Sequence, residues 1–270
     1  MTDPIESNRA LWDEWAEINA ASDFYDLPSF ISGDQGIRLR AYELEEVGDV
    51  AGKDLLHIQC HIGTQTLSWA RLGANVTGTD FSEVSLMKAR ELSDAIGVPA
   101  RFVQSETYKL PEVLRDQFDI VYMSGGVLGW LPDMAKLGEV IAGYVKPGGF
   151  FYLAEIHPIA MVFDEDTQEQ LKLKWPYWTH RDPIVVPTKG SYADRTANMT
   201  STYEYGWNHS LGEVVTGLAS AGLRIDSLRE YPFVEWPVGF LEERGDGKWV
   251  LPAHHEGELP LFFSIKASKE

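Results

Sequence analysis

Residues 54–80 read DLLHIQCHIGTQTLSWARLGANVTGTD, and this stretch holds the clearest secondary-structure pattern in the chain. The apolar run 54–60 predicts a strand, 64–73 predicts a helix that ends at Gly73, and 75–80 predicts a second short strand. A strand, a helix and a strand in this order predict two parallel strands joined by a helical crossover.

The same alternation continues toward the C-terminus. The further predicted elements are helices over 82–97, 134–145 and 210–223, and strands over 100–105, 118–125, 150–156, 224–233 and 259–268. The last strand is expected to be antiparallel. The pattern therefore predicts an α/β fold with a doubly wound, mostly parallel, seven-stranded sheet that contains one antiparallel strand.

Two segments depart from this alternation. Apolar residues follow the predicted N-cap Ser7 at helical spacing, which predicts an amphipathic helix over 7–21. After His157 an aromatic, proline-bearing stretch runs to about Thr200, and it is too long for a structureless loop. The predicted division is an N-terminal helical segment (1–50), a core (51–157), an inserted aromatic lid (158–205) and a completion of the core sheet (206–270).

Composition restricts the function classes. The 23 Lys and Arg residues face 41 Asp and Glu residues, and the formal charge of −18 disfavours binding to nucleic acid and to anionic membranes. Cys60 is the one cysteine, which excludes an internal disulfide and a cysteine-rich zinc site, and we expect no metal. The N-terminus lacks the pattern of a signal peptide and no apolar run approaches eighteen residues, so we expect a cytoplasmic protein.

The turn HIQCHIGTQ after the first strand and the acid that closes the second strand point to a nucleotide site. A turn between a strand and a helix directs backbone N–H groups at a ligand, and Asp80 can accept hydrogen bonds from ribose hydroxyls. Nicotinamide, flavin and S-adenosylmethionine proteins share this arrangement, so these two features leave the cofactor open.

The order of five segments resembles the class I S-adenosylmethionine-dependent methyltransferases, in particular a bacterial group that acts on small molecules. The resemblance spans about Leu39 to His157. In that family the first strand ends in acid-x-Gly-x-Gly-x-Gly, whereas residues 57–63 read HIQCHIG and keep only Gly63. The second-strand acid matches Asp80, the third-strand acid matches Glu106, and FDIVYMSGGVLGWLPD and KPGGFFYLAE match the later segments.

The resemblance implies S-adenosylmethionine as cofactor, S-adenosylhomocysteine as product, and a set of contact residues. The candidates are Gln59, His61 and Gly63 in the turn, Asp80 for the ribose, Phe81, Ser105, Glu106 and Thr107 for the adenine, and the carbonyls of Ser124 and Gly125 for the amino group. Because Gln59 and His61 carry Cβ atoms, we expect the backbone there to avoid positive φ.

Methyl transfer is an in-line displacement, so the enzyme mainly aligns the acceptor and excludes water. His157, after the fifth strand, is the leading candidate for a general base, with a structural histidine as the alternative. Aromatic residues are expected to wall the site of a neutral or cationic small-molecule acceptor. The candidates are Trp12, Trp15, Trp130, Trp178, Tyr203 and Trp207.

Several alternatives remain open at this point. A nicotinamide-dependent oxidoreductase would share the sheet and the ribose acid but would want a compact G-x-G-x-x-G turn, which 57–65 does not provide. The altered glycine turn also leaves room for a catalytically silent S-adenosylmethionine or S-adenosylhomocysteine binder. The acceptor, its methylated oxygen, nitrogen or sulfur atom, and a monomeric or homodimeric state are not determined by the sequence.

Overall fold

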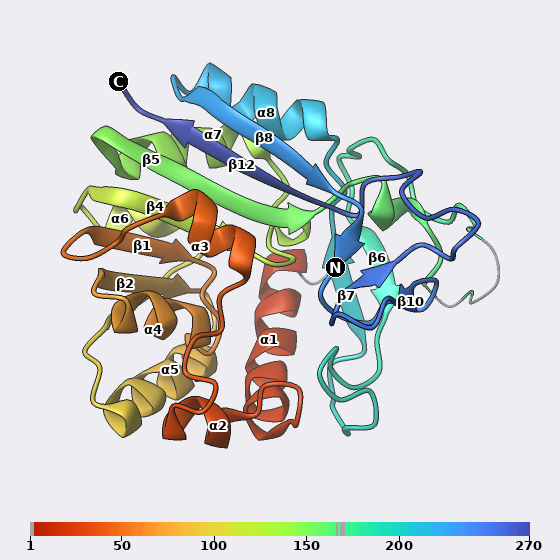
Figure 1. The fold of residues 1–270 in the computed structure, drawn as a ribbon, viewed down its shortest axis with the longest axis horizontal. Coiled ribbons are helices and arrows are strands. Elements are labelled where there is room, and N and C mark those ends of the chain that lie inside the picture. The colour runs from red at the N-terminus through yellow and green to blue at the C-terminus, as the bar shows by residue number, and fades with distance from the viewer. Residues whose placement is uncertain (1–2, 166, 168–170) are drawn as a thin grey trace.

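The central element of the computed structural model, which describes residues 3–165, 167 and 171–270, is a seven-stranded sheet (Figure 1). Its order is β3-β2-β1-β4-β5-β12-β8. The strands are β1 (Asp54–Ile58), β2 (Asn75–Asp80), β3 (Arg101–Gln104), β4 (Phe118–Ser124), β5 (Val145–Ile156), β8 (Arg224–Tyr231) and β12 (Phe262–Ser268). Only β12 runs antiparallel to its neighbours β5 and β8. The predicted fold class is confirmed.

Helices cover both faces of this sheet. They include α3 (Ala41–Val47), α4 (Thr64–Arg71), α5 (Glu83–Ile96), α6 (Leu110–Val113), α7 (Met134–Tyr144) and α8 (Leu211–Ser220). Side chains alternate along β4, so Val121 and Met123 pack with α6, α7 and α8, whereas Ile120 and Tyr122 pack with α3 and α4. Since the chain passes from β1 to β2 and β3 and then returns to β4, the strand order reverses between β1 and β4, where sheets of this kind bind ligands.

A close backbone contact joins α7 to α8. A Cβ atom placed on Gly138 of α7 would lie 2.2 Å from the carbonyl oxygen of Gly217 in α8. Gly143, in the same helix, faces open space. The two helices therefore approach each other at a distance that only glycine allows at position 138.

Helix α1 (Pro4–Ala21) packs against α5 on one side and against the segment 203–206 on the other (Figure 1). The helix begins earlier than predicted, because the Asp3 side chain accepts the N–H of Ile5 and Pro4 occupies the first turn. The predicted cap Ser7 lies inside the helix. A short helix, α2 (Leu27–Ser32), follows.

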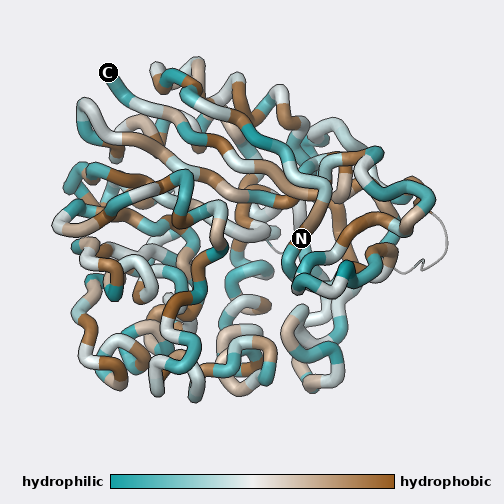
Figure 2. The backbone as a smooth tube through the Cα atoms, in the orientation of Figure 1, coloured by the Kyte–Doolittle hydropathy of each residue, from teal (hydrophilic) through white to brown (hydrophobic). Residues whose placement is uncertain are grey.

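Two insertions form a lobe beside the carboxyl ends of the strands, with hydrophobic stretches of its own (Figure 2). The first follows β5 and contains η3 (Ala160–Val162) and the antiparallel pair β6 (Ile184–Pro187) and β7 (Tyr203–Gly206). Residues 166 and 168–170 of the predicted lid lie outside the described residues. The second insertion follows β8 and contains β9 (Phe233–Val234), β10 (Glu242–Glu243) and β11 (Trp249–Val250).

The sequence division did not separate this second insertion from the core. Its strands are two residues long, and such short segments carry no readable alternation of polar and apolar residues. Within the described residues, no helix is long and apolar enough to cross a membrane.

Candidate functional site

A cavity of about 680 Å³ opens at the carboxyl ends of β1, β2 and β4. Its lining comes from the turn after β1, the strand ends, helix α1, the segment 38–40 and both insertions. The position is the one at which the strand order reverses.

The turn from Gln59 to Gly63 has an unusual backbone. Gln59, His61 and Gly63 have φ angles of 59°, 49° and 79°, so every second residue is left-handed. The expectation that Gln59 and His61 avoid positive φ is therefore wrong. A left-handed conformation costs a residue with a Cβ atom about 1–2 kcal/mol. The turn keeps the alternating glycine-like backbone shape although only Gly63 is a glycine.

Contacts around the turn explain why this conformation persists. The two ring nitrogens of His61 lie 3.0 Å from Asn19 Nδ2 and 3.1 Å from Ser85 Oγ. A Cβ atom on Gly63 would lie 2.8 Å from Cβ of Ala89, so this position requires glycine for space as well as for φ. Gln59 and His61 both line the cavity.

Asp80 holds the turn from the end of β2. Its Oδ2 accepts the backbone N–H of His61 at 2.9 Å, and its Oδ1 accepts that of Ser82 at 2.9 Å. Burial raises the pKa of Asp80 to about 6. A carboxylate offers about four acceptor positions, so acceptor capacity remains for a ligand beside these backbone hydrogen bonds. Asp80 and Phe81 both line the cavity, and their contacts with ribose and adenine stay predictions.

Four polar atoms of cavity-lining residues are buried without a hydrogen-bond partner among the described residues. They are Trp12 Nε1, Arg38 Nε, His57 Nε2 and Gln59 Oε1. Buried polar groups in folded proteins are nearly always paired. Because their residues line the cavity, these four atoms are candidates for contact with a molecule bound there. Sequence reasoning missed Arg38, because nothing in its local pattern connects it to the turn that begins 21 residues later.

His57 occupies the position of the acid found in the resembling family. Its Nδ1 lies 2.8 Å from Thr66 Oγ1, and its ring packs edge-on against Tyr122 with centroids 4.8 Å apart. Burial lowers the pKa of His57 to about 3, so the ring is neutral at physiological pH. The negative charge usual at this position is thus replaced by an uncharged group.

The loop after β4 is shaped by a buried carboxylate. Glu155 on β5 accepts N–H groups from Gly126, Val127, Leu128 and Ile156, at 2.6–2.9 Å. This arrangement holds the loop that begins with Ser124 and Gly125, both of which line the cavity. Glu155 was missed by sequence reasoning, although a carboxylate in the apolar run FFYLAEI was a usable signal.

An aromatic group covers the turn. The Trp12 ring packs edge-on against Trp15, Trp130 and His61, with centroid distances of 5.1, 5.2 and 5.0 Å. The predicted acceptor residues Trp12, Trp15 and Trp130 line the cavity. The structure does not bring the other three there: Trp178 and Tyr203 are 69% and 51% exposed, and Trp207 is buried elsewhere.

His157 also lies apart from the cavity lining. Its Nδ1 accepts the N–H of Ile159 at 3.1 Å, and its Nε2 lies 3.0 Å from Glu230 Oε1. The backbone N–H of His157 donates to the carbonyl of Leu261, so position 157 extends β5 alongside the residues that precede β12. Its side chain thus faces Glu230 in β8, the edge strand of the sheet. Nothing in this geometry supports its predicted role as a base.

The predicted adenine residues after β3 are likewise not part of the lining. The N–H of Ser105 donates to the carbonyl of Asp80 at 2.9 Å, Glu106 forms an ion pair with Lys109 at 2.9 Å, and Thr107 is buried. Their contact with adenine stays a prediction.

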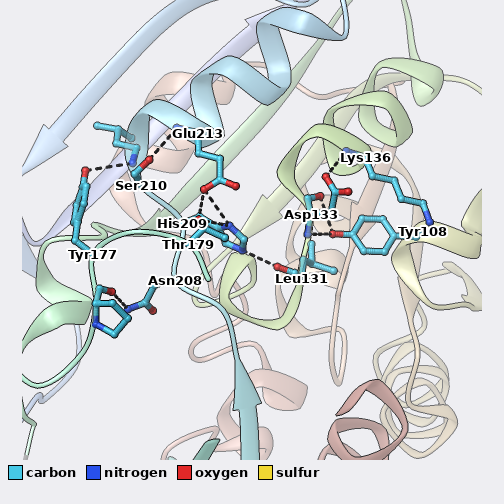
Figure 3. Close-up of polar contacts among 12 residues, drawn as sticks. Tyr108, Leu131, Asp133, Lys136, Tyr177, Thr179, Asn208, His209, Ser210 and Glu213 are labelled. Carbon is cyan, nitrogen blue, oxygen red and sulfur yellow. Dashed lines mark hydrogen bonds and ion pairs between the residues drawn. The ribbon is translucent and has the colours of Figure 1, made fainter. Parts of the chain in front are cut away.

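A second polar network anchors the first insertion to the core (Figure 3). His209 Nε2 donates to the carbonyl of Leu131 at 2.6 Å, and Thr179 of the insertion donates to Glu213 of α8. The Asn208 amide donates to the carbonyl of Pro176 at 2.6 Å. These contacts fix the position of the lobe that covers the cavity.

Comparison with known proteins identifies the family. Residues 56–153 match the family described as "Methyltransferase domain". A ubiquinone biosynthesis O-methyltransferase of Pseudomonas fluorescens (strain Pf0-1) is 32% identical over 60% of this chain and 71% of its own length. The chain belongs to the class I S-adenosylmethionine-dependent methyltransferases.

Other relatives of this methyltransferase match over a smaller part. The enzyme of the same name from Pseudomonas aeruginosa (strain UCBPP-PA14) is 34% identical over 53% of this chain. The match spans 62% of that relative's length, so it leaves more than a third of the relative uncovered.

Solved structures of methyltransferases share the fold. An S-adenosylmethionine-dependent methyltransferase from Mesorhizobium loti superposes with a TM-score of 0.57 at 20% identity, over 84% of this chain and 95% of that chain. A glycopeptide N-methyltransferase complexed with S-adenosylmethionine gives a TM-score of 0.53 at 16% identity, over 85% and 86% of the two chains. At identities of 20% and 16% these similarities show a shared fold only.

Proposed function

We propose that this methyltransferase binds S-adenosylmethionine in the cavity and transfers the methyl group to an oxygen, nitrogen or sulfur atom of a small molecule. The observation that carries the proposal is the turn from Gln59 to Gly63, whose backbone alternates left-handed residues and whose Gln59 and His61 line the cavity beside the buried Asp80. This backbone shape is what the glycine-rich turn of the family would adopt, and here it is preserved without two of the glycines.

The unpartnered atoms fit the amino-acid end of the cofactor. The N–H groups of Trp12 and Arg38 suit a carboxylate, and the Gln59 amide oxygen suits an ammonium group. Asp80 suits the ribose hydroxyls, and Phe81 lies next to it for the adenine. When bound, the cofactor supplies an electrophilic methyl group on a positively charged sulfur.

Three further residues that the sequence predicted as cofactor contacts complete the proposed binding site. His61, Ser124 and Gly125 lie in the lining and are proposed as contacts of the cofactor. The aromatic group around Trp12 and the two insertions exclude water from the cavity and orient the acceptor, which are the main requirements of a methyl transfer.

The proposal extends to the acceptor, the partners and the location. The names of the curated relatives favour an oxygen acceptor. The charge of −18 opposes nucleic acid as a partner, and we propose a monomer or homodimer. The single, buried thiol of Cys60 suits a reducing compartment such as the cytoplasm.

Calorimetric titration with S-adenosylmethionine, S-adenosylhomocysteine, NADH and NADPH tests the cofactor. We expect binding of the first two ligands only, at least tenfold weaker for Asp80→Ala because hydrogen bonds to a charged group are lost. The exposed Asp116→Ala is the matched control. Binding should also weaken as the pH falls below about 6, where Asp80 takes up a proton.

Each other outcome has a definite meaning. Binding of NADH in place of S-adenosylhomocysteine would favour an oxidoreductase. Binding of S-adenosylmethionine without turnover on a broad panel of hydroxyl, amine and thiol acceptors would favour a silent binder. No binding of either sulfur ligand would refute the proposed function.

A further inference from the structure

We propose that Glu204 is the catalytic base of this methyltransferase and that the acceptor is an uncharged, largely apolar molecule that presents a hydroxyl group to it. The inference rests on the proposed function and names the substrate class of the same cavity. Sequence analysis did not single out Glu204, which lies in the short strand β7.

The pair β6 and β7 directs Glu204 into the cavity. Glu204 is paired in register with Val186, and both residues line the cavity. Val185 and Tyr203, the residues directly before them in each strand, are outside the lining and are 47% and 51% exposed. Because side chains alternate along a strand, this register fixes the direction of the Glu204 side chain.

Two sets of backbone contacts place β7 against the cofactor half of the cavity. The Asn8 side chain of α1 donates to the carbonyl of Tyr205 at 2.7 Å and accepts its N–H at 3.0 Å. The N–H of Trp207 donates to the carbonyl of Gly129 at 2.9 Å, in the loop that follows β4. Glu204 is thus held beside the two elements that carry Trp12 and Trp130.

The surroundings of Glu204 suit a base. Burial raises the pKa of Glu204, and the like charge of Glu165 acts in the same sense, while a hydrogen bond from Thr188 and the charge of Arg195 act against them. A carboxylate with a raised pKa is a stronger proton acceptor, and its charge is stabilised by a hydroxyl that donates to it.

The charges in this half of the cavity favour an uncharged acceptor. Of the described insertion residues that line it, Glu165 and Glu204 are acidic and Lys174 and Arg195 are basic, so their formal charges cancel. The rest of the insertion lining is mainly apolar, with Trp175, Val186, Val234, Trp236, Val238, Phe240 and Leu241. A cation would gain no net attraction here, whereas an apolar body would bury its surface.

The proposed step balances as follows. The O–H bond of the acceptor breaks, and its proton passes to a carboxylate oxygen of Glu204. The acceptor oxygen forms the new bond to the methyl carbon, the carbon–sulfur bond breaks, and its electron pair stays on sulfur. The products are a methyl ether, S-adenosylhomocysteine and a protonated Glu204, which returns the proton to water.

Three naphthalene probes test this inference by calorimetry in saturating S-adenosylhomocysteine. They are 2-naphthol, 2-methoxynaphthalene and 2-(aminomethyl)naphthalene, which present a hydroxyl, an ether and an ammonium group. We expect the wild type to bind 2-naphthol about tenfold more tightly than the ether, since a hydrogen bond to a charged group has this size. Glu204→Gln should reduce the preference to less than about threefold, and Glu204→Asp should retain part of it.

The controls separate this inference from the function on which it rests. Glu242→Gln, the same change on the exposed strand β10, should keep the tenfold preference. All variants should bind S-adenosylhomocysteine as the wild type does, which also shows that they fold. An unchanged preference in Glu204→Gln, no preference in the wild type, or tightest binding of the ammonium probe would overturn the inference. Failure of the wild type to bind S-adenosylhomocysteine would instead overturn the proposed function.

Discussion

Replacing Gln59 by glycine should stabilise the protein and weaken its binding of the cofactor. The residue has a φ of 59°, a conformation that costs about 1–2 kcal/mol with a Cβ atom present, and its amide oxygen is buried without a partner among the described residues. Glycine removes both penalties but loses about 0.5–1 kcal/mol through the entropy of the unfolded chain. The net gain is expected to be about 1 kcal/mol.

Two measurements on Gln59→Gly test this reasoning. The gain corresponds to a rise of about 2 °C in Tm for a chain of this size, which differential scanning calorimetry resolves. The affinity for S-adenosylhomocysteine should fall about tenfold, because the amide oxygen is proposed to accept the ammonium group.

A matched variant is available at Asp26, another non-glycine residue with positive φ, at 37°. It lies outside the cavity lining and caps α2, so Asp26→Gly should leave the affinity unchanged. A less stable Gln59→Gly protein with unaltered affinity would show that the left-handed turn is neither strained nor part of the binding site.

Two further predictions concern stability. The pKa of His57 is lower in the folded protein than in the unfolded chain, so stability is lost as the pH falls from about 6.5 toward 3. In urea titrations the wild type should therefore lose about 2 kcal/mol more than His57→Gln between pH 7 and pH 5. Equal losses in the two proteins would contradict a buried, neutral His57 ring. Gly138→Ala should destabilise the protein by about 2 kcal/mol, because the new Cβ atom would meet the backbone of Gly217. Gly143→Ala, which faces open space in the same helix, should stabilise it by about 0.5–1 kcal/mol. Thermal unfolding of both variants checks this, and an undiminished stability of Gly138→Ala would show that α7 and α8 can move apart.

The sequence was most informative where contacts are local. The alternation of apolar strands and amphipathic helices was sufficient to predict the sheet and its antiparallel strand, because period and length are properties of short segments. Asp80 was found as the acid at the end of the second strand, since the carboxyl ends of neighbouring parallel strands meet at one edge of the sheet.

The sequence was misleading about the backbone at Gln59 and His61, and it did not reveal where the His157 side chain lies. Gln59 and His61 adopt positive φ because the surrounding sheet and Asp80 determine the turn more strongly than the local preference does. The candidate base His157 follows a strand that ends near the site, yet its side chain faces Glu230 on the sheet edge. The direction of a side chain just past a strand depends on its neighbours in space.

The sequence alone was sufficient for the fold and the family, since these depend on residues within about a hundred positions of one another. Only the tertiary structure brought Arg38, Trp12 and Glu204 to the same cavity. The Asn8 side chain donates a hydrogen bond to the carbonyl of Tyr205, 197 residues later in the sequence. This contact helps to place the neighbouring Glu204 in the cavity lining. No local period encodes such a pairing, because it forms only when α1 and the insertion pack on the finished sheet.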